Sequence, residues 1–468
     1  MAKTALVWLR NDLRLGDNPA LGAAFELGGP VVAVYVHETD PTLRAPGGAA
    51  RWWLHHSLRD LGLQLAQLGV SLLVRSGPAQ ECVRQARRET GAAAVLWNRR
   101  YGPAERAIDA TIKSGLQADG IAVTSFAGNV LAEPWTIKTR TSTPYSVYTP
   151  FWNTLKATDI AVPLRAPPAR TGIRREAVDG AYREPKWATK LKAHWRIGEA
   201  AAHATLADFL DDRLSDYPVG RDIPAREATS RLSPHLRFGE ISPRQVWHAG
   251  LALAQREPAR AEAVNKFLSE LAWRDFNYHQ LYHRDDIAVV PMQGKYAELS
   301  WRHAPEELQA WQAGQTGFPI IDAGMRELWA TGFMQNRVRM LAASLLAKNL
   351  LIDWRLGEHW FWDCLLDADG ANNPGNWQWV AGSGLDASPY FRIFNPVTQG
   401  ERFDADGRYV RQWVPELAKL PVEWLQQPFA APAETLRAAG IELGHTYPRP
   451  IVDLKHSRQR ALDAAKAL

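Results

Sequence analysis

The chain has 468 residues, 46% of them hydrophobic, and a formal net charge of +5. This length allows large buried cores and predicts two or three domains, while the mild basic excess is compatible with a nucleic-acid partner without pointing to one. Two cysteines, Cys82 and Cys364, exclude a disulfide framework and favour a cytoplasmic protein. The first apolar run, Ala5–Leu9, is too short for a signal peptide, and no run has the length of a membrane span.

Short apolar runs alternate with helical patterns in the first part of the chain. The runs are rich in β-branched residues and comprise Ala5–Leu9, Val31–Val36, Ser71–Val74, Ala94–Trp97 and Ile121–Thr124. Helical patterns such as Trp52–Leu68 and Ala79–Arg88 lie between them. This alternation predicts a parallel, Rossmann-like sheet with crossover helices over residues 1–128. The sequence there has neither the glycine fingerprint of a dinucleotide site nor a P-loop, so neither standard site is supported.

The rest of the chain divides into a connector and a helical part. Residues 129–198 are rich in proline and show little periodicity, which predicts an interdomain connector. From residue 199 to residue 468 the pattern is almost wholly helical, with turn signals at Gly314–Gly317 and Asn372–Gly375. The clearest predicted helices are Ala263–Tyr282, Pro319–Thr331, Gln335–Asn349, Gly357–Leu366 and the terminal Ser457–Leu468.

One predicted helix places an acid, an aromatic ring and a cation on the same face. Glu270, Trp273 and Arg274 stand at positions i, i+3 and i+4. Such a face can hydrogen-bond a base edge, stack on the base and meet a phosphate. The segment by itself favours the simpler interpretation, an exposed Glu–Arg pair beside a partly buried Trp.

Two later segments carry further candidate residues. Asn336 and Met340 are four residues apart and flanked by Arg337 and Arg339, so together they could bind a planar ligand. The simpler interpretation is the start of an ordinary amphipathic helix. The polar run that begins at Asp367 predicts a loop, and two tryptophans follow it, one residue apart. On a helix these tryptophans would face different directions, which is hard to explain by core packing alone.

Together with Thr229–Ser233, these segments resemble the photolyase/cryptochrome flavoproteins, and the similarity runs from Trp8–Arg14 to Tyr447–Val452. The closest likeness is to bacterial photolyases of class I or class III that repair cyclobutane pyrimidine dimers, and Asn372–Trp379 looks more like class III. The resemblance implies an α/β antenna-binding domain and a large all-α domain that binds FAD. It also implies light-driven repair, in which excited reduced FAD lends an electron to the dimer, the cyclobutane ring opens and the electron returns. No metal takes part.

The resemblance assigns the FAD site residue by residue. The matching positions are Tyr217, Thr229, Ser230, Arg231, Leu232, Ser233, Trp273, Arg274, Arg339, Asp367, Asp369 and Asn373. Asn373 matches the residue that faces flavin N5, where plant cryptochromes have an acid. An amide there can hydrogen-bond the ring without supplying a proton, which favours the anionic reduced flavin over a stored neutral radical.

The lesion and DNA contacts follow in the same way. The dimer is expected to flip out of the duplex into a pocket formed by Glu270, Trp273, Asn336, Met340 and Trp379. Glu270 would hydrogen-bond a pyrimidine edge and stabilise the dimer radical anion. Three arginines match phosphate-contacting positions, which place DNA without reading its sequence; they are Arg221, Arg337 and Arg392. Arg337 is alternatively a plain surface charge.

Three tryptophans match the electron-transfer chain of the family, with Trp377 nearest the flavin, then Trp354, and Trp301 at the surface. Such a chain would let light reduce a bound oxidised flavin. Trp360 and Trp362 offer a parallel route, and simple packing is the alternative for every one of these residues.

The sequence also bears on the antenna pigment and on rival functions. Glu105 matches an acid used for folate, so a folate (MTHF) antenna is expected, although Ala104 departs from the pattern. The main rival function is a cryptochrome-type blue-light photoreceptor. A (6-4) repair enzyme and a non-catalytic nucleotide-binding protein are weaker alternatives. The expected partner is DNA that contains pyrimidine dimers, with no membrane association and a monomeric chain.

Overall fold

The computed structural model describes residues 3–169, 180 and 182–468, so part of the predicted connector lies outside the described residues. The chain divides into two compact units. The first unit comprises Met1–Ser215, Ser230–Asp285 and Asp367–Ala371. The second comprises Asp216–Thr229, Asp286–Leu366 and Asn372–Leu468. The chain therefore passes between the units several times.

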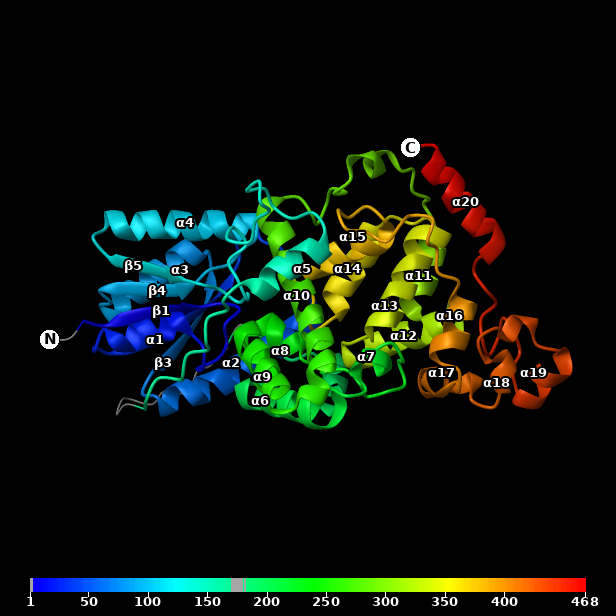
Figure 1. Cartoon of the computed structure of the whole chain (residues 1–468), viewed down its shortest axis with the longest axis horizontal. Coiled ribbons are helices and arrows are strands. Elements are labelled where there is room, and N and C mark those ends of the chain that lie inside the picture. Colours follow the sequence, from blue (N-terminus) through cyan, green and yellow to red (C-terminus); the bar gives the residue numbers. More distant parts are fainter. Residues whose placement is uncertain (1–2, 170–179, 181) are drawn as a thin grey trace. The chain divides into compact units, whose positions relative to one another are not determined.

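A five-stranded parallel sheet forms the α/β part of the first unit (Figure 1). Its strands are β1 (Ala5–Leu9), β2 (Val31–Glu38), β3 (Ser71–Gly77), β4 (Ala94–Asn98) and β5 (Ala122–Phe126). They lie in the order β3-β2-β1-β4-β5, with Val7 level with Ala33 on one side and Leu96 on the other. Each predicted apolar run is a strand, so the predicted parallel sheet is confirmed.

Helices cover both faces of this sheet, as parallel strands require. They are α1 (Pro19–Glu26), α2 (Gly48–Gln67), α3 (Ala79–Thr90) and α4 (Pro103–Ala118). Leu6 and Trp8 of β1 belong to a buried cluster with residues of α3 and α4. Because side chains alternate along a strand, Val7 points to the opposite face, where α1 packs on β1 and β4.

Helices also make up the remainder of the first unit. They are α5 (Tyr148–Ala157), η1 (Lys186–Ala193), α6 (Glu199–Asp208), η2 (Phe209–Arg213), α8 (Ser233–Phe238), α9 (Pro243–Arg256), η3 (Pro258–Arg260) and α10 (Ala261–His283). The expectation of little periodicity in the connector was wrong at α5. Its buried residues Tyr148, Phe151, Trp152 and Leu155 have helical spacing, and Pro150 lies in the first turn, where no amide is needed.

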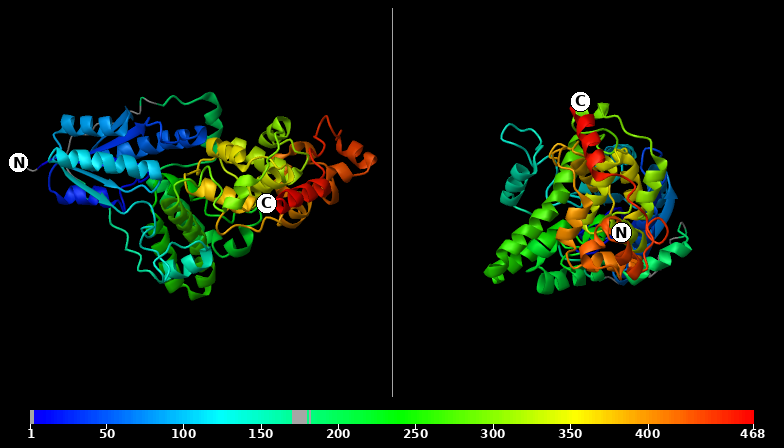
Figure 2. Two further views of the ribbon diagram at one scale, coloured as in Figure 1. Left: turned by 90° about the horizontal axis from the view of Figure 1, so that it is seen from above. Right: turned by 90° about the vertical axis from the view of Figure 1, so that its right-hand side faces the viewer.

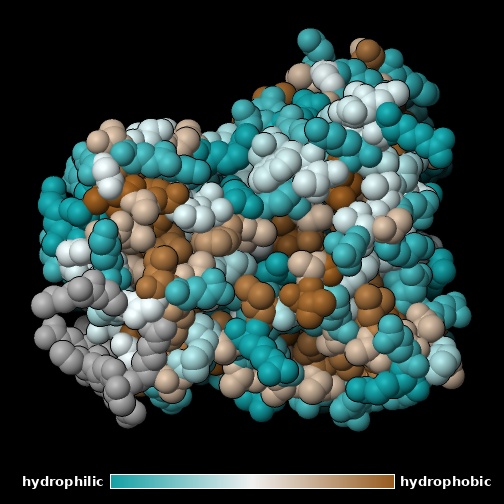
Figure 3. Space-filling view, turned by 60° about the vertical axis from the view of Figure 1, so that its left-hand side comes forward, coloured by the Kyte–Doolittle hydropathy of each residue, from teal (hydrophilic) through white to brown (hydrophobic). Residues whose placement is uncertain are grey.

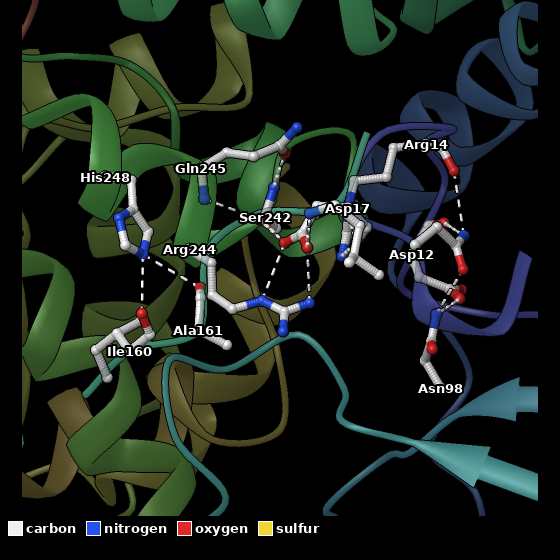
Figure 4. Close-up of polar contacts among 12 residues, drawn as sticks. Asp12, Arg14, Asp17, Asn98, Ile160, Ala161, Ser242, Arg244, Gln245 and His248 are labelled. Carbon is white, nitrogen blue, oxygen red and sulfur yellow. Dashed lines mark hydrogen bonds and ion pairs between the residues drawn. The ribbon is translucent and has the colours of Figure 1, made fainter. Parts of the chain in front are cut away.

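A buried carboxylate joins the loop after β1 to the start of α9 (Figure 4). Asp17 is fully buried and accepts hydrogen bonds from Nε and Nη2 of Arg244 at 3.0 and 2.8 Å and from Ser242 Oγ at 2.5 Å. Arg14 donates to the Asp17 carbonyl at 2.8 Å. A buried charge is tolerated when it is paired in this way. The network fixes α9, and α9 packs against α10, which carries three of the candidate residues.

The second unit is helical throughout its described residues (Figures 1 and 2). Its longer helices are α11 (Pro305–Ala313), α12 (Pro319–Thr331), α13 (Asn336–Ser344), α14 (Trp354–Cys364), α15 (Asn372–Ala381), α16 (Pro396–Phe403) and α20 (Leu454–Lys466). Shorter turns and helices are α7 (Tyr217–Gly220), η4 (Gly294–Glu298), η5 (Leu345–Asn349), α17 (Arg408–Trp413), η6 (Pro415–Leu417), α18 (Val422–Leu425), η7 (Pro428–Ala430) and α19 (Ala433–Ala439).

Two predictions for this unit were wrong in detail. The single helix expected over Gln335–Asn349 changes after Ser344 into the π-turn η5, where the Leu350 amide bonds the Leu345 carbonyl. The turn expected at Asn372–Gly375 is the first turn of α15. Pro374 is the third residue of that helix, where its missing amide proton breaks no helical hydrogen bond.

Hydrophobic residues on the face shown in Figure 3 form small patches among hydrophilic ones. Among the described residues, no helix is both long enough and apolar enough to cross a membrane.

Candidate functional site

Helix α10 presents Glu270, Trp273 and Arg274, all half-buried, from one face in the first unit. Glu270 accepts a hydrogen bond from Lys266 Nζ at 2.7 Å, one turn earlier on the helix. Arg274 Nη1 donates to the Asn129 carbonyl at 2.7 Å. The structure therefore gives the acid and the guanidinium separate anchors on either side of the tryptophan.

Trp273 is held by a residue that the sequence analysis missed. The ring of Tyr148, on α5, stacks on the Trp273 ring with 3.8 Å between centroids and 9° between planes. The Tyr148 hydroxyl donates to the carbonyl of Ser269, and Phe276 meets Trp273 edge-on at 5.7 Å. One face of the indole is thus covered by protein. The helical spacing of the apolar residues in α5 was the signal that could have found Tyr148.

The short loop Asp367–Ala371 brings two carboxylates into the first unit. Ser233 Oγ donates to Asp367 at 2.6 Å, so two predicted flavin contacts meet directly. Asp369 accepts from the Ala371 amide at 2.8 Å, and Arg237 donates to the Ala368 carbonyl at 2.8 Å. The predicted Thr229–Ser233 turn contains Arg231 at a positive φ of 53° and leads into α8, which has only six residues.

Arg274 lies in a strongly buried and charged neighbourhood. Its Nη2 is buried and has no hydrogen-bond partner in the described part of the chain. The guanidinium lies 4.8 Å from the ring centre of Tyr278, whose pKa is raised by burial and by the charge of Asp369. Burial also raises the pKa of Asp275 to about 6, against the lowering effect of Arg274. An unused guanidinium donor at such a place suits an anionic ligand.

In the second unit, α13 brings together the residues that the sequence paired. Asn336 is exposed, and its Nδ2 lies 3.7 Å from Met340 Sδ. Arg337 forms an ion pair with Asp222 at 2.8 Å and lies over the ring of Phe403. Arg337 is therefore held between an acid and an aromatic ring.

The start of α13 also anchors the segment that carries two further candidates. Gln335 Nε2 donates to the carbonyl of Arg221, and the Arg221 guanidinium lies 5.5 Å from the ring centre of Tyr217. Arg339 Nε donates to the carbonyl of Met334, just before α13, at 2.6 Å, and this bond orients the arginine.

Asn373, near the start of α15, is fixed by a fully buried acid. Asn373 Nδ2 donates to Glu358 Oε1 at 2.7 Å and to the Glu358 carbonyl at 3.0 Å. Because the amide nitrogen is used in this way, the carbonyl oxygen of the side chain is the atom that can accept from a ligand. Glu358 is a second supporting residue that sequence reasoning did not predict, since its sequence neighbours give no sign of a buried acid.

The two tryptophans of α15 lie in different surroundings, as their spacing predicts. Trp377 is buried against Phe361 at 5.0 Å and Trp311 at 6.1 Å, while Trp379 is half-buried. A Cβ at Gly357 would overlap the Trp377 ring, so the close approach of α14 requires glycine.

The other predicted electron-transfer tryptophans also lie in the second unit. Trp354 is fully buried, with the Arg355 guanidinium 5.4 Å from its ring centre. Trp301 is partly buried against a cluster that includes Tyr296 and Tyr390. Trp360 stacks on the exposed Trp329 at 6.0 Å, and Trp362 is half-buried.

Between the two tryptophans of α15 stands Gln378, a residue that the sequence analysis passed over. It is fully buried, and its Nε2 donates to the carbonyls of Ile287 and Val290 at 2.7 and 3.0 Å. Its Oε1 accepts from the Met292 amide at 2.8 Å and from Ser383 Oγ at 3.2 Å. One amide therefore ties α15 to the loops on either side.

The expected antenna residue has a structural partner. Glu105 Oε2 accepts from the Gly102 amide at 3.0 Å and caps the start of α4. The next residue, Arg106, pairs with Asp285 at 2.7 Å and lies over the ring of Tyr282.

Comparison with known proteins places this geometry in a family. Residues 5–169 match the family model described as DNA photolyase, and residues 267–467 match the FAD binding domain of DNA photolyase. The chain is 48% identical to a deoxyribodipyrimidine photo-lyase of Agrobacterium fabrum, over 100% of this chain and 98% of that one. The chain belongs to the DNA photolyase family.

Solved structures and plant relatives agree with this assignment. A crystal structure of a bacterial class III photolyase from Agrobacterium tumefaciens matches this photolyase-family chain with a TM-score of 0.95 and 48% identity, covering 100% of this chain and 98% of that one. Cryptochrome-1 of Arabidopsis thaliana is 37% identical over 98% of this chain and 70% of its own length. The family, the α/β plus helical fold and the FAD-binding domain expected from the sequence are therefore confirmed.

Proposed function

We propose that this chain uses bound FAD and blue light to split cyclobutane pyrimidine dimers in DNA, as a deoxyribodipyrimidine photo-lyase. The observation that carries the proposal is the 48% identity to such an enzyme over the whole chain. The placement of Glu270 and Trp273 on one face of α10, and of Asn336 beside Met340 on α13, supports it because these are the residues expected to receive the lesion.

The residues expected to hold FAD fit an anionic, planar cofactor. When bound and excited, the reduced flavin supplies the electron that opens the dimer. In the first unit, the buried and unused Arg274 Nη2 suits the anionic part, and Ser233 with Asp367 offers a fixed hydroxyl–carboxylate pair. Further contacts in this unit come from Ser230, Arg231, Leu232, Trp273 and Asp369, and contacts in the second unit come from Tyr217, Thr229, Arg339 and Asn373.

Asn373 is proposed to accept a hydrogen bond from flavin N5. Its amide nitrogen is committed to Glu358, so its carbonyl oxygen is left for the ligand. An amide at this position has no proton to transfer near neutral pH, which favours the anionic reduced flavin over a stored neutral radical.

The residues proposed to contact the lesion have different chemical roles. Glu270 accepts from a pyrimidine N–H, and Lys266 holds it in position. Trp273 and Trp379 provide apolar walls for the saturated rings, while Asn336 and Met340 contact the remaining edge. The proposed phosphate contacts are Arg221, Arg337 and Arg392, which fix the strand without selecting its sequence.

Trp377, Trp354 and Trp301 are proposed to pass electrons to an oxidised flavin, with Trp360 and Trp362 as a parallel route. The burial of Trp377 and Trp354 and the partial exposure of Trp301 support an order from inside to surface.

A folate antenna at Glu105 is proposed as an accessory pigment. One oxygen of Glu105 caps α4 in this structure, so Glu105→Gln, which keeps that acceptor, should lose any co-purifying folate without destabilising the chain. Folate retained at wild-type levels in that variant would remove Glu105 from the site.

We also propose that the chain is organised as a 128-residue antenna domain, a connector over residues 129–198 and an FAD domain over residues 199–468. Its proposed working form is a cytoplasmic monomer on DNA. Sedimentation of the purified chain with and without a dimer-containing oligonucleotide tests the assembly state, because a sedimenting mass of two chains would contradict it.

The second candidate function is a blue-light photoreceptor, which the 37% identity to Cryptochrome-1 favours. A repair assay separates the two. The purified, reduced protein is mixed with an oligonucleotide that carries a thymine dimer, and recovery of thymine absorbance is followed in blue light and in the dark. Recovery in light alone is the expected result. No recovery with flavin bound and reduced would contradict the repair function and favour the photoreceptor.

A further inference from the structure

A buried lysine lies beneath an exposed loop of the second unit. Lys348, on the π-turn η5, is 1% exposed, and its Nζ donates to the carbonyl of Arg392 at 3.0 Å. The same ammonium is 5.4 Å from the ring centre of Tyr390. No carboxylate forms an ion pair with Lys348 in the described part of the chain.

The loop above Lys348 turns one side chain inward and two outward. Tyr390 is buried and stacks on Tyr296 at 5.6 Å, whereas Phe391 and Arg392 are exposed, Phe391 to 69%. The ends of the loop are fixed by hydrogen bonds from the Ser388 amide to the Trp379 carbonyl and from the Phe394 amide to Ser344 Oγ. The loop is therefore held at both ends, and Lys348 supports it at Arg392, whose side chain is exposed.

A buried ammonium without a carboxylate is costly, so its retention calls for a reason. Burial, and next the positive charge of Arg392, lower the pKa of Lys348 from its ordinary 10.5 to about 7. The positive charges of Lys348 and Arg392 therefore repel each other at the point where DNA is proposed to bind. A hydrophobic residue of the same size would pack there at lower cost.

We infer that Lys348 is a positioning residue for DNA, because its hydrogen bond to the Arg392 carbonyl sets the backbone from which Arg392 reaches a backbone phosphate. The inference rests on the proposed role of Arg392 as a phosphate contact. A phosphate bound at Arg392 offsets the charge that opposes protonation of Lys348. DNA binding and protonation of Lys348 therefore favour each other, and affinity should fall as the pH rises through about 7.

Several charged groups on the elements packed against η5 have partners of their own. On α20, Arg460 donates to the Asn349 carbonyl at 2.6 Å. At the start of α14, Asp353 pairs with Arg355 at 2.7 Å, and the buried Glu358 accepts from Asn373. On α13, Arg337 pairs with Asp222 and Arg339 donates to Met334. Lys348 is the group among them whose pKa the charge of Arg392 lowers.

The test measures the dissociation constant of a dimer-containing oligonucleotide in the dark by fluorescence anisotropy, at about pH 6 and about pH 8. For the wild type, we expect binding to weaken about fivefold between these values. At the lower pH, Lys348→Met should bind about tenfold more weakly than the wild type. The affinity of the variant itself should be the same at both pH values. Because it replaces a buried charge with an apolar chain of similar size, this variant should fold, and an unchanged flavin content verifies this.

Two further variants make the result decisive. Lys295→Met removes an exposed lysine that lies over Tyr296 of the same ring stack, and should keep the wild-type pH dependence. Arg392→Ala tests the underlying contact, and adding Lys348→Met to it should have no further effect. If Arg392→Ala weakens binding but Lys348→Met does not, the role of Lys348 is refuted alone. If Arg392→Ala leaves binding unchanged, the phosphate contact itself is refuted, and the role of Lys348 with it.

Discussion

Helices α10 and α15 carry most of the predicted chemistry, but they are held in place in different ways. Helix α10 has 23 residues, and its candidate side chains are supported from outside by single contacts such as the Tyr148 stack on Trp273. Helix α15 has ten residues, and two buried amides bind it to its surroundings, Asn373 by two hydrogen bonds and Gln378 by four.

The two helices should therefore differ in whether a lost supporting contact affects ligand binding alone or stability and function together. A long helix keeps its shape when one supporting side chain is removed, so changes around α10 should act on ligand binding more than on folding. A short helix whose buried amides satisfy loop backbone groups should lose stability and function together. Variants of the supporting residues therefore test the comparison.

The largest effect is expected for Gln378→Leu. The variant leaves the Met292 amide, the Ile287 and Val290 carbonyls and Ser383 Oγ without their buried partner. We expect a loss of about 4 kcal/mol in the free energy of unfolding, measured by urea denaturation, with loss of repair. Gln293→Leu is the matched control. It removes a half-buried amide that donates to Gly384 of the same loop and should cost about 1 kcal/mol. Equal losses in the two variants would show that Gln378 has no special share in holding α15.

A smaller effect is expected for Gly357→Ala, which pushes a methyl group into the Trp377 ring and into Leu346. Overpacking of this kind should cost about 2 kcal/mol and slow light-driven reduction of oxidised flavin, measured by bleaching of the flavin band. Gly22→Ala, in α1, meets nothing within 4 Å and should leave both quantities unchanged or slightly raise stability. Wild-type photoreduction in Gly357→Ala would show that the position of Trp377 does not matter for that process.

For α10, Tyr148→Leu should act on binding more than on folding. Loss of the stack frees the Trp273 ring and should weaken binding of dimer-containing DNA by up to about tenfold, while flavin content stays the same. Tyr148→Phe keeps the stack and should bind nearly as the wild type does. Phe151→Leu, on the same helix but packed on Phe276 and His279, should lower stability without this loss of affinity. A similar loss of affinity in Phe151→Leu would mean that Tyr148 contributes only to packing and has no specific role in DNA binding.

The smallest effect is expected for Lys266→Ala. Lys266 is 43% exposed, so its ion pair with Glu270 is screened by solvent and should contribute at most about 0.5 kcal/mol. Thermal unfolding should show almost no change in midpoint. A drop of several degrees would mean that Glu270 is part of the structural framework of α10.

The sequence could predict those features that depend on local spacing. The strands, α10 and the Asn336–Met340 pair follow from periodicity and from positions one turn apart, and the resemblance supplied their roles. The roles of Gln378 and Glu358 could not be predicted, because each depends on a partner distant in the sequence. Helical spacing in α5 could have marked Tyr148 as buried, but it could not reveal the stack on Trp273. The start of α15 at Asn372 was missed because Asn, Pro and Gly are typical turn residues that a helix also accepts in its first turn.

The central claim, that Glu270 acts on the dimer itself, is tested most directly by the repair yield per absorbed photon of Glu270→Ala at saturating DNA. A lost hydrogen bond to a charged group is worth about 1.5–3 kcal/mol, so the yield should fall by about tenfold or more, with flavin content and unfolding midpoint kept. An unchanged yield with DNA fully bound would contradict the assignment and leave Glu270 as an ordinary surface acid paired with Lys266.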